Sequence, residues 1–180
     1  ESRDTGSPQV FGGQVLGQAL MAAHCTIEDE RVVHSMHAYF LRRGDFTKPI
    51  VYSVDRSRDG GSFSARRVVA VQDGEQIFIS SASFQKPEKG LEYQATAPQV
   101  PPPEELVPLS NPPQAVIDKL PEKLRRWLKI ERPFEFRPVQ PYNPFVPVAS
   151  PPFRQIWMRA IDKLSDDPTL HQCLLAYISD

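Results

Sequence analysis

Proline is distributed very unevenly along this chain of 180 residues, and its distribution constrains the fold more than any other sequence feature. Fifteen of the 19 prolines lie between residues 98 and 152, some of them in runs such as Pro101-Pro102-Pro103. Proline fixes φ and lacks a backbone N–H, so this stretch favours extended, polyproline-like pieces. A connector of such length is more typical of a link between two bodies than of a surface loop. We therefore expect an N-terminal unit over residues 1–90, a connector over 91–152, and a second unit that starts at residue 153.

The first ninety residues have the pattern of one compact α+β unit. Residues 14–25 are small or apolar on almost every side, which is typical of a helix that other elements surround. Four strand-like segments follow, at residues 32–42, 50–56, 63–71 and 76–84. The dipeptide Asp73-Gly74 between the last two is a strong hairpin signal. The pattern predicts a central helix inside an antiparallel meander of four strands.

The rest of the chain contains fewer regular signals. Apolar residues at helical spacing predict one helix inside the connector, over residues 113–130. Residues 153–161 resemble a strand, and the acids before Pro168 predict the start of a helix. The apolar stripe of this last helix consists of Leu170, Leu174, Leu175 and Ile178. The chain stops straight after the stripe without a helix stop signal, so we expect a fragment whose second unit is incomplete.

Composition and charge exclude several classes of protein. The chain has 21 Lys and Arg against 22 Asp and Glu, a formal net charge of −1, and no basic block, which argues against nucleic acid as a partner. No apolar run approaches the roughly 18 residues that a membrane span needs. The two cysteines, Cys25 and Cys173, are too few for a disulfide framework and fit a reducing compartment.

The histidines do not form a convincing metal site. His34 and His37 are three residues apart, and on a regular strand such side chains point to opposite faces. His171 and Cys173 are two apart on an expected helix and cannot face one ion together. We therefore expect no metal site.

Three further sets of residues have two readings each. Gly12-Gly13 opens the first helix and could present N–H groups to an anion or a carbonyl oxygen, or could be a tight helix entry. Arginines beside the 59–62 turn could meet phosphates or be solvated; they are Arg58, Arg66 and Arg67. Asp180 ends an apolar stripe, where partial desolvation would raise its pKa and suit a general base. A frayed, exposed end is the other reading of Asp180.

Five segments, in order along the chain, carry a family resemblance. They are 9–20 (QVFGGQVLGQAL), 34–45 (HSMHAYFLRRGD), 58–68 (RDGGSFSARRV), 82–85 (ASFQ) and 174–180 (LLAYISD). In them the chain resembles acyl-CoA thioesterase II, the TesB type. The resemblance implies a double hot-dog fold, each unit a long helix wrapped by an antiparallel sheet, with the second unit truncated here. It also implies hydrolysis of fatty acyl-CoA to a fatty acid and CoA, with no metal or organic cofactor.

The resemblance assigns expected roles to three residues. Asp180 matches the family's catalytic aspartate, which works with a Ser or Thr and a Gln to activate a water molecule for direct attack on the thioester. Those two partners lie further along the family's sequence than residue 180. Gly13 and His34 fall in motifs of the first unit, and we expect them to line the path of the acyl or pantetheine group.

Two other functions stay open at this point. A protein of only 180 residues would lack the partners of Asp180 and would be a non-catalytic acyl-CoA-binding or assembly module. Another hot-dog enzyme, such as an enoyl-CoA hydratase, pairs its Asp with a nearby His, but no His lies within the six residues before Asp180. Exposed sheet edges and faces favour a homo-oligomer. The family resemblance leaves two locations, the bacterial cytosol or the peroxisome.

Overall fold

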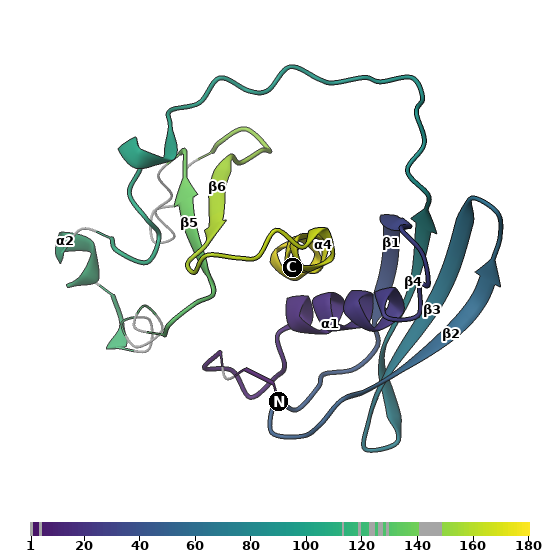
Figure 1. Ribbon diagram of the computed structural model, residues 1–180. Coiled ribbons are helices and arrows are strands. Elements are labelled where there is room, and N and C mark those ends of the chain that lie inside the picture. The colour runs from purple at the N-terminus through teal and green to yellow at the C-terminus, as the bar shows by residue number, and fades with distance from the viewer. Residues whose placement is uncertain are drawn as a thin grey trace. The chain divides into compact units, whose positions relative to one another are not determined.

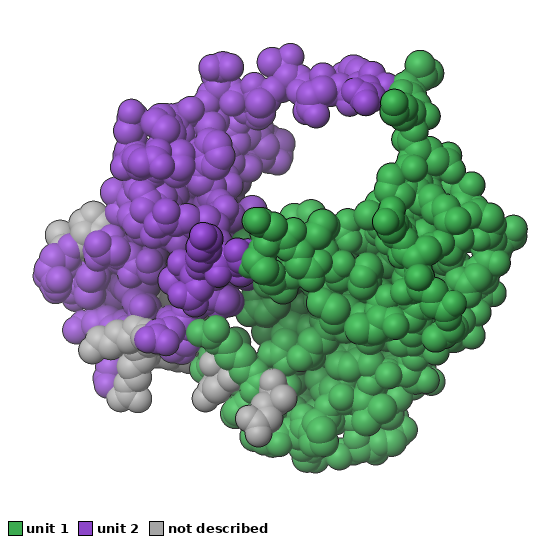
Figure 2. All heavy atoms as spheres, viewed as in Figure 1, with its two compact units in different colours: residues 1–91, 165–180 green, residues 92–164 purple. Residues whose placement is uncertain are grey.

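The structure is a computed structural model in which the chain forms two compact units. It describes residues 2–3, 5–112, 114–118, 120–122, 125, 128, 130–140 and 149–180. Unit 1 comprises Glu1–Leu91 together with Ser165–Asp180, and unit 2 comprises Glu92–Leu164 (Figure 2). The last helix therefore belongs with the first ninety residues. The division expected from the sequence, into residues 1–90, 91–152 and 153–180, stays a prediction.

Unit 1 is built from one long helix and a four-stranded antiparallel sheet, as the sequence predicts. The helix α1 spans Gly12–His24 and lies along one face of the sheet (Figure 1). The strands are β1 (Val32–Phe40), β2 (Val51–Asp59), β3 (Phe63–Gln72) and β4 (Glu75–Gln85). In β3 and β4 buried and less buried residues alternate, so one face of the sheet packs on α1. The shared core contains Val15, Ala19, Leu20, Ala23, Val68, Ala70, Phe78, Ala82 and Phe84.

The order of the strands differs from a simple meander. The sheet has the order β1-β4-β3-β2, so β1 pairs with β4 from Val32↔Gln85 to Phe40↔Phe78. Short turns join β2 to β3 and β3 to β4, whereas residues 41–50 are too many for a tight hairpin. They instead cross the end of the sheet, where the Gln72 amide donates to the carbonyls of Asp45 (2.9 Å) and Lys48 (3.1 Å). The expected meander is therefore right for β2 to β4 and wrong for β1.

The turn between β3 and β4 has the conformation that its sequence predicts. Asp73 has φ of 51° and Gly74 has φ of 80°. Positive φ at both central residues matches the twist of the flanking strands, which is why Asp-Gly is favoured there.

The helix α4, Pro168–Ile178, packs against α1 inside unit 1 (Figure 1). The Asp167 carboxylate caps it by accepting a hydrogen bond from the Thr169 N–H at 2.9 Å. Two glycines of α1 allow the close approach. A Cβ on Gly13 would overlap the carbonyl oxygen of Tyr177, and one on Gly17 would lie 2.9 Å from that of Cys173. The small residues of the first helix thus lie where another backbone comes close.

The most buried residue of α4 lies outside the leucine stripe expected from the sequence, although Leu170, Leu174 and Ile178 of that stripe are half-buried. Cys173 is the buried residue of the helix, and Leu175 is 68 % exposed. The glycine positions on α1 decide which side of α4 approaches. That side carries Cys173 and Tyr177, one helical turn apart.

Unit 2 consists of a two-stranded sheet and extended segments. The strands β5 (Phe134–Pro138) and β6 (Ile156–Ala160) pair antiparallel. Pro133 precedes β5 and Pro138 is its last residue, so the sequence did not predict this strand. The strand β6 is shorter than the expected 153–161. Extended proline-rich backbone binds this pair: the Trp157 indole donates to the Pro101 carbonyl at 3.0 Å, and Arg137 donates to that of Pro103 at 2.6 Å.

Unit 2 also contains short helical pieces. Those whose bounds fall within the described residues are the 3-10 turn η1 (Pro103–Glu105) and the four-residue helix α2 (Gln114–Ile117). The helix expected over 113–130 depended partly on Leu124 and Trp127, which lie outside the described residues. Across the described parts of both units, no helix is long and apolar enough to cross a membrane.

Candidate active site

The carboxylate of Asp180 lies at the N-terminus of α1. The Gly13 N–H donates a hydrogen bond to Asp180 Oδ2 at 3.1 Å. The first N–H groups of a helix have no partner within the helix, and here the N-cap residue Phe11 supplies no side-chain acceptor. Asp180, beyond the end of α4, provides that acceptor. The helix dipole adds a favourable interaction with its negative charge.

Packing at this point leaves no room for side chains on the first two residues of α1. A Cβ on Gly12 would lie 2.9 Å from Asp180 Oδ2, and one on Gly13 would overlap the Tyr177 carbonyl. The rings of Phe11 and Tyr177 meet edge to face with their centroids 5.0 Å apart. The glycine pair is therefore more than a tight helix entry, because it lets a carboxylate from another helix reach the first N–H groups of α1.

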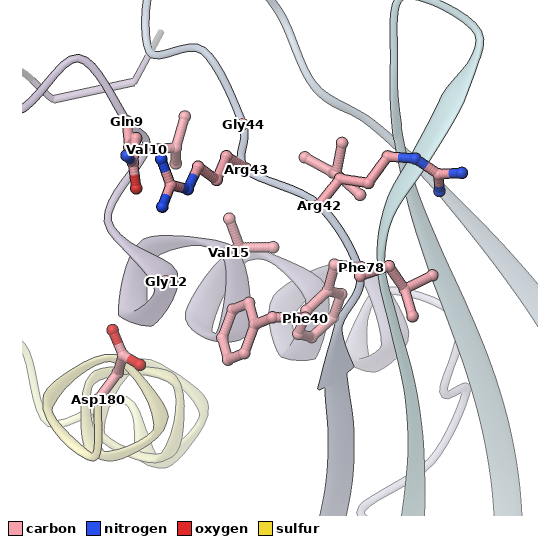
Figure 3. A pocket seen from close by; sticks show the side chains of 12 residues that line it. Gln9, Val10, Gly12, Val15, Phe40, Arg42, Arg43, Gly44, Phe78 and Asp180 are labelled. Atoms are coloured by element: carbon pink, nitrogen blue, oxygen red, sulfur yellow. The ribbon is translucent and has the colours of Figure 1, made fainter.

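Asp180 borders a cavity of about 370 Å³ (Figure 3). Its volume is in the range of small-molecule sites, which are roughly 300–1,000 Å³. Apolar side chains from α1, β1 and β4 form part of its wall, and they are Val15, Phe40, Ile77 and Phe78. Residues from the chain before α1 and from the loop after β1 complete the rim, among them Gln9, Val10, Arg43 and Gly44. Figure 3 shows Asp180 on one side of this cavity and Arg43 on another.

Asp180 is the last residue of the chain and is exposed. The partial desolvation of its carboxylate stays a prediction. The order of Asp180 comes from the Gly13 hydrogen bond and the wall of the cavity, not from burial.

His34 lies apart from the Asp180 cavity. Its Nε2 is 2.8 Å from the Ser83 hydroxyl, and its ring packs edge to face on Phe63. It also borders a second cavity of about 330 Å³ between α1, β1 and α4, whose wall includes Leu16, Leu20, Val33, Met36 and Ala176. A role for His34 in substrate binding stays a prediction.

The prediction that His34 and His37 face opposite sides of the sheet was wrong. The register of β1 against β4 shifts between Val33 and Ser35, which is a β-bulge at His34. The extra residue in the bulge reverses the alternation of side chains between the two sheet faces, so residues three apart across it lie on the same face. His34 reaches Ser83, and His37 pairs with Ser81, two residues away and thus on the same face of β4.

Arg66 has a structural role: its guanidinium is buried and bonded within the protein, so it is neither solvated nor open to a phosphate. Its side chain is 1 % exposed and forms an ion pair with Asp59 at 2.6 Å. Its Nε donates to the Thr26 hydroxyl, also at 2.6 Å, and its Nη1 to the Arg58 carbonyl at 3.0 Å. These bonds tie the bulged end of β2 to β3 and to the turn after α1. Arg58 and Arg67 are exposed.

The remaining metal-type side chains are scattered. Within the described ranges of the chain, no three His, Cys, Asp or Glu residues gather as metal ligands. His171 Nε2 lies 2.8 Å from the Ser165 carbonyl. Burial, and to a smaller extent Asp167, raises the pKa of the Cys173 thiol to about 11, so this thiol is a poor nucleophile at neutral pH.

Comparison with known proteins identifies the family. A model of the acyl-CoA thioesterase N-terminal domain matches residues 1–85, and an acyl-CoA thioesterase model matches residues 124–180. Acyl-CoA thioesterase 2 of Haemophilus influenzae is 44 % identical over 180 residues, which are 100 % of this chain and 63 % of that protein. The chain belongs to the TesB-type acyl-CoA thioesterase family. The resemblance seen in the five sequence segments is thereby confirmed.

Solved structures confirm the hot-dog fold of this TesB-type chain. The acyl-CoA thioesterase II TesB2 from Mycobacterium marinum has a TM-score of 0.70 at 40 % identity, over 95 % of this chain and 59 % of that one. A protein of unknown function with a hot-dog fold, from Alicyclobacillus acidocaldarius, also gives 0.70, at 21 % identity over 94 % of this chain and 58 % of its own, and supports the fold alone. The chain spans less than two thirds of the length of each of these relatives.

The sequence pointed to Asp180 and Gly13, but not to their contact or to most of the cavity. Phe40 and Phe78 have the sequence pattern of ordinary strand residues. Arg43 belongs to one of the five family segments, but nothing in the sequence assigned it a role. The pairing of β1 with β4 brings these side chains near the start of α1, and no local pattern encodes that pairing.

Proposed function

We propose that the protein containing this chain hydrolyses fatty acyl-CoA thioesters, with Asp180 as the carboxylate that activates water. The observation that supports the proposal most directly is the hydrogen bond from Gly13 N–H to Asp180 Oδ2 at the edge of a substrate-sized cavity. Family membership supports the same chemistry, because both relatives of high identity named above are acyl-CoA thioesterases.

The proposed reaction is direct attack of water on the thioester carbonyl carbon. Asp180 accepts a proton from the water as its oxygen bonds to that carbon, which gives a tetrahedral oxyanion. The carbon–sulfur bond then breaks, and the CoA thiolate takes up the proton from Asp180. The products are the fatty acid and CoA. No metal or cofactor enters this scheme.

Gly13 has a positioning role in this scheme. With Oδ2 fixed by the Gly13 N–H, the orientation of the whole carboxylate is set, and Oδ1 is left to meet the water. An oriented base gains rate because the reacting atoms are already in place. Gly13 thus contacts the proposed base. The expected contact between Gly13 and substrate stays a prediction.

The direct test is an Asp180→Asn variant of the full-length protein. Asn retains an oxygen that can accept from the Gly13 N–H, so the site keeps its shape and loses only the base. We expect kcat for octanoyl-CoA to fall by roughly 10²–10⁴-fold, measured by release of the CoA thiol. Circular dichroism and melting temperature should stay at the wild-type values.

Asp166→Asn is the matched control, because Asp166 is an exposed aspartate just before α4 and makes no cap contact. It should hydrolyse octanoyl-CoA at the wild-type rate. Equal activity of the Asp180→Asn and Asp166→Asn proteins would refute Asp180 as the base. A wild-type protein that binds octanoyl-CoA without hydrolysing it would support an acyl-CoA-binding module instead.

Two wider properties accompany the proposed activity. We propose a homo-oligomer, because large apolar side chains such as Val51 and Phe63 are exposed on the strands of unit 1. We also propose the cytosol as its compartment in a bacterium, or the peroxisome in a eukaryote. Fractionation of cells that carry the tagged protein would decide the compartment.

A further inference from the structure

The loop between β1 and β2 carries three cationic side chains, and two of them form ion pairs with nearby carboxylates. Arg42 forms an ion pair with Glu75 at 3.2 Å and donates to the Gln76 carbonyl at 2.8 Å. Lys48 forms an ion pair with Asp73. Arg43 makes no hydrogen bond and no ion pair with any residue that the structure describes.

Arg43 borders the cavity that also contains Asp180 (Figure 3). In this view the Arg43 side chain lies toward Gln9 and Val10 at the rim, whereas the side chain of Arg42, which also borders the cavity, points the other way. The free guanidinium and the proposed base therefore belong to one cavity. Apolar side chains, including Phe40 and Ile77, also line this cavity.

The backbone on both sides of Arg43 is held in place. The Leu41 N–H donates to the Ile77 carbonyl at 2.9 Å, and the Val10 N–H donates to the Gly44 carbonyl at 2.8 Å. The Asp45 N–H donates to the Gln72 side chain at 2.7 Å. A cation on such an anchored segment loses little backbone freedom when it binds an anion.

An acyl-CoA molecule has matching chemistry at two separated points. Its thioester is uncharged, a pantetheine arm follows, and beyond the arm are a diphosphate and a 3′-phosphate. If the thioester lies at Asp180, the phosphates must lie away from that carboxylate, which would repel them. A guanidinium binds phosphate well because its planar donors can form two parallel hydrogen bonds.

We propose that Arg43 binds a phosphate group of the CoA moiety and so selects CoA thioesters over thioesters without phosphates. This inference rests on the proposed thioesterase function and adds the group that recognises the nucleotide end of the substrate. Arg43 acts in binding and makes no contact with the reacting atoms.

The test compares Arg43→Gln with Lys48→Gln in the full-length protein, on octanoyl-CoA and on octanoyl-pantetheine, which lacks phosphates. We expect Arg43→Gln to raise KM for octanoyl-CoA roughly three- to tenfold. The same variant should change KM for octanoyl-pantetheine by less than about twofold, because the pair that is lost is absent from that substrate. Lys48→Gln removes a charge from the same loop outside the cavity and breaks only the side-chain contact with Asp73, so it should leave both KM values near wild type.

Further arms identify the phosphate and separate this inference from the activity itself. Octanoyl-dephospho-CoA lacks the 3′-phosphate; if the Arg43→Gln defect vanishes with it, Arg43 binds that group, and if the defect persists, Arg43 binds the diphosphate. Titration calorimetry with free CoA gives a readout that needs no hydrolysis, and Arg43→Gln should weaken CoA binding by a similar factor.

The inference fails if Arg43→Gln and wild type bind CoA equally, or if the variant raises KM equally for octanoyl-CoA and octanoyl-pantetheine. A protein that binds CoA through Arg43 but hydrolyses no thioester would leave this inference standing and refute the proposed function.

Discussion

Arg66 has the sequence context of an exposed arginine, but its side chain is buried and paired with Asp59. The sequence places Arg66 beside a turn, among other arginines, where solvation is the common outcome. Its β-strand alternation, with Ser64 and Val68 also buried, instead directs the guanidinium inward. Asp59 is half exposed, but its Oδ1 accepts from the Ser64 hydroxyl and from Arg66, each at 2.6 Å.

These contacts predict a pH dependence of stability. The Ser64 hydroxyl, and then Arg66, lower the pKa of Asp59 below its ordinary value. The folded state therefore binds fewer protons than the unfolded state in the acid range, and stability rises with pH there. The contribution is complete above the unfolded pKa of about 3.9 and is lost as pH falls through the lower, folded pKa.

Asp59→Asn should accordingly flatten the acid limb of the stability curve. Urea unfolding of the full-length protein between about pH 3 and pH 6 measures this slope for wild type and variant. Ser64→Ala removes the largest cause of the pKa shift and should flatten the slope as well. Parallel curves for wild type and Asp59→Asn would contradict this account.

At the scale of elements, the contact between α1 and α4 depends on the absence of side chains. Glycines at positions 13 and 17 share a face of α1, one turn apart, and face the carbonyls of Tyr177 and Cys173. The same close approach holds Asp180 at the start of α1. The packing of α4 on α1 therefore also sets the position of the Asp180 carboxylate.

We expect Gly13→Ala to destabilise the protein by about 1–3 kcal/mol or more, because the new methyl group meets backbone that cannot rotate away. It should also lower kcat for octanoyl-CoA by separating Gly13 from Asp180. Gly61→Ala is the matched control, since a Cβ there meets no atom within 4 Å. Thermal and urea unfolding measure the stability, and equal midpoints for the two variants would refute the packing argument.

Local sequence patterns predict some features of these elements but not which other element each one packs against. The Asp73-Gly74 turn and the start of α4 at Asp167 follow from local backbone chemistry, and both were predicted correctly. The partner of β1 and the bulge at His34 depend on β4, whose paired residues lie 38 positions (Phe40↔Phe78) to 53 positions (Val32↔Gln85) further along the chain. The exposed side of α4 depends on α1, and β5 depends on β6. Periodicity within a segment contains no information about such partners.

At the scale of the whole molecule, unit 1 leaves apolar surface exposed. Tyr39 is 59 % exposed, Val51 64 % and Phe63 47 %, and each lies on a strand of the sheet. Val51 and Phe63 alternate with residues that are more buried, so they lie on the sheet face away from α1. An exposed apolar face of this kind is typical of surfaces that another protein surface covers.

The full-length protein should therefore have a solution mass that is a multiple of its chain mass, as measured by light scattering after size exclusion. Val51→Lys should shift this mass toward the monomer, because it places a charge in the apolar face. Glu88→Lys, a charge change at an exposed position just after β4, should have no such effect. A monodisperse monomer of the unaltered protein would contradict the prediction.

The sequence by itself determined the helix and four strands of unit 1, the hairpin at Asp73-Gly74, the start of α4 and the family. Each of these follows from short-range chemistry or from a string of consecutive residues. The tertiary structure alone decided that β1 pairs with β4, that Arg66 is buried, that Gly13 binds Asp180 and that Arg43 borders the same cavity without a partner. The reason is that these contacts join residues far apart in the chain, and they form only when helix packing and strand pairing bring those residues together.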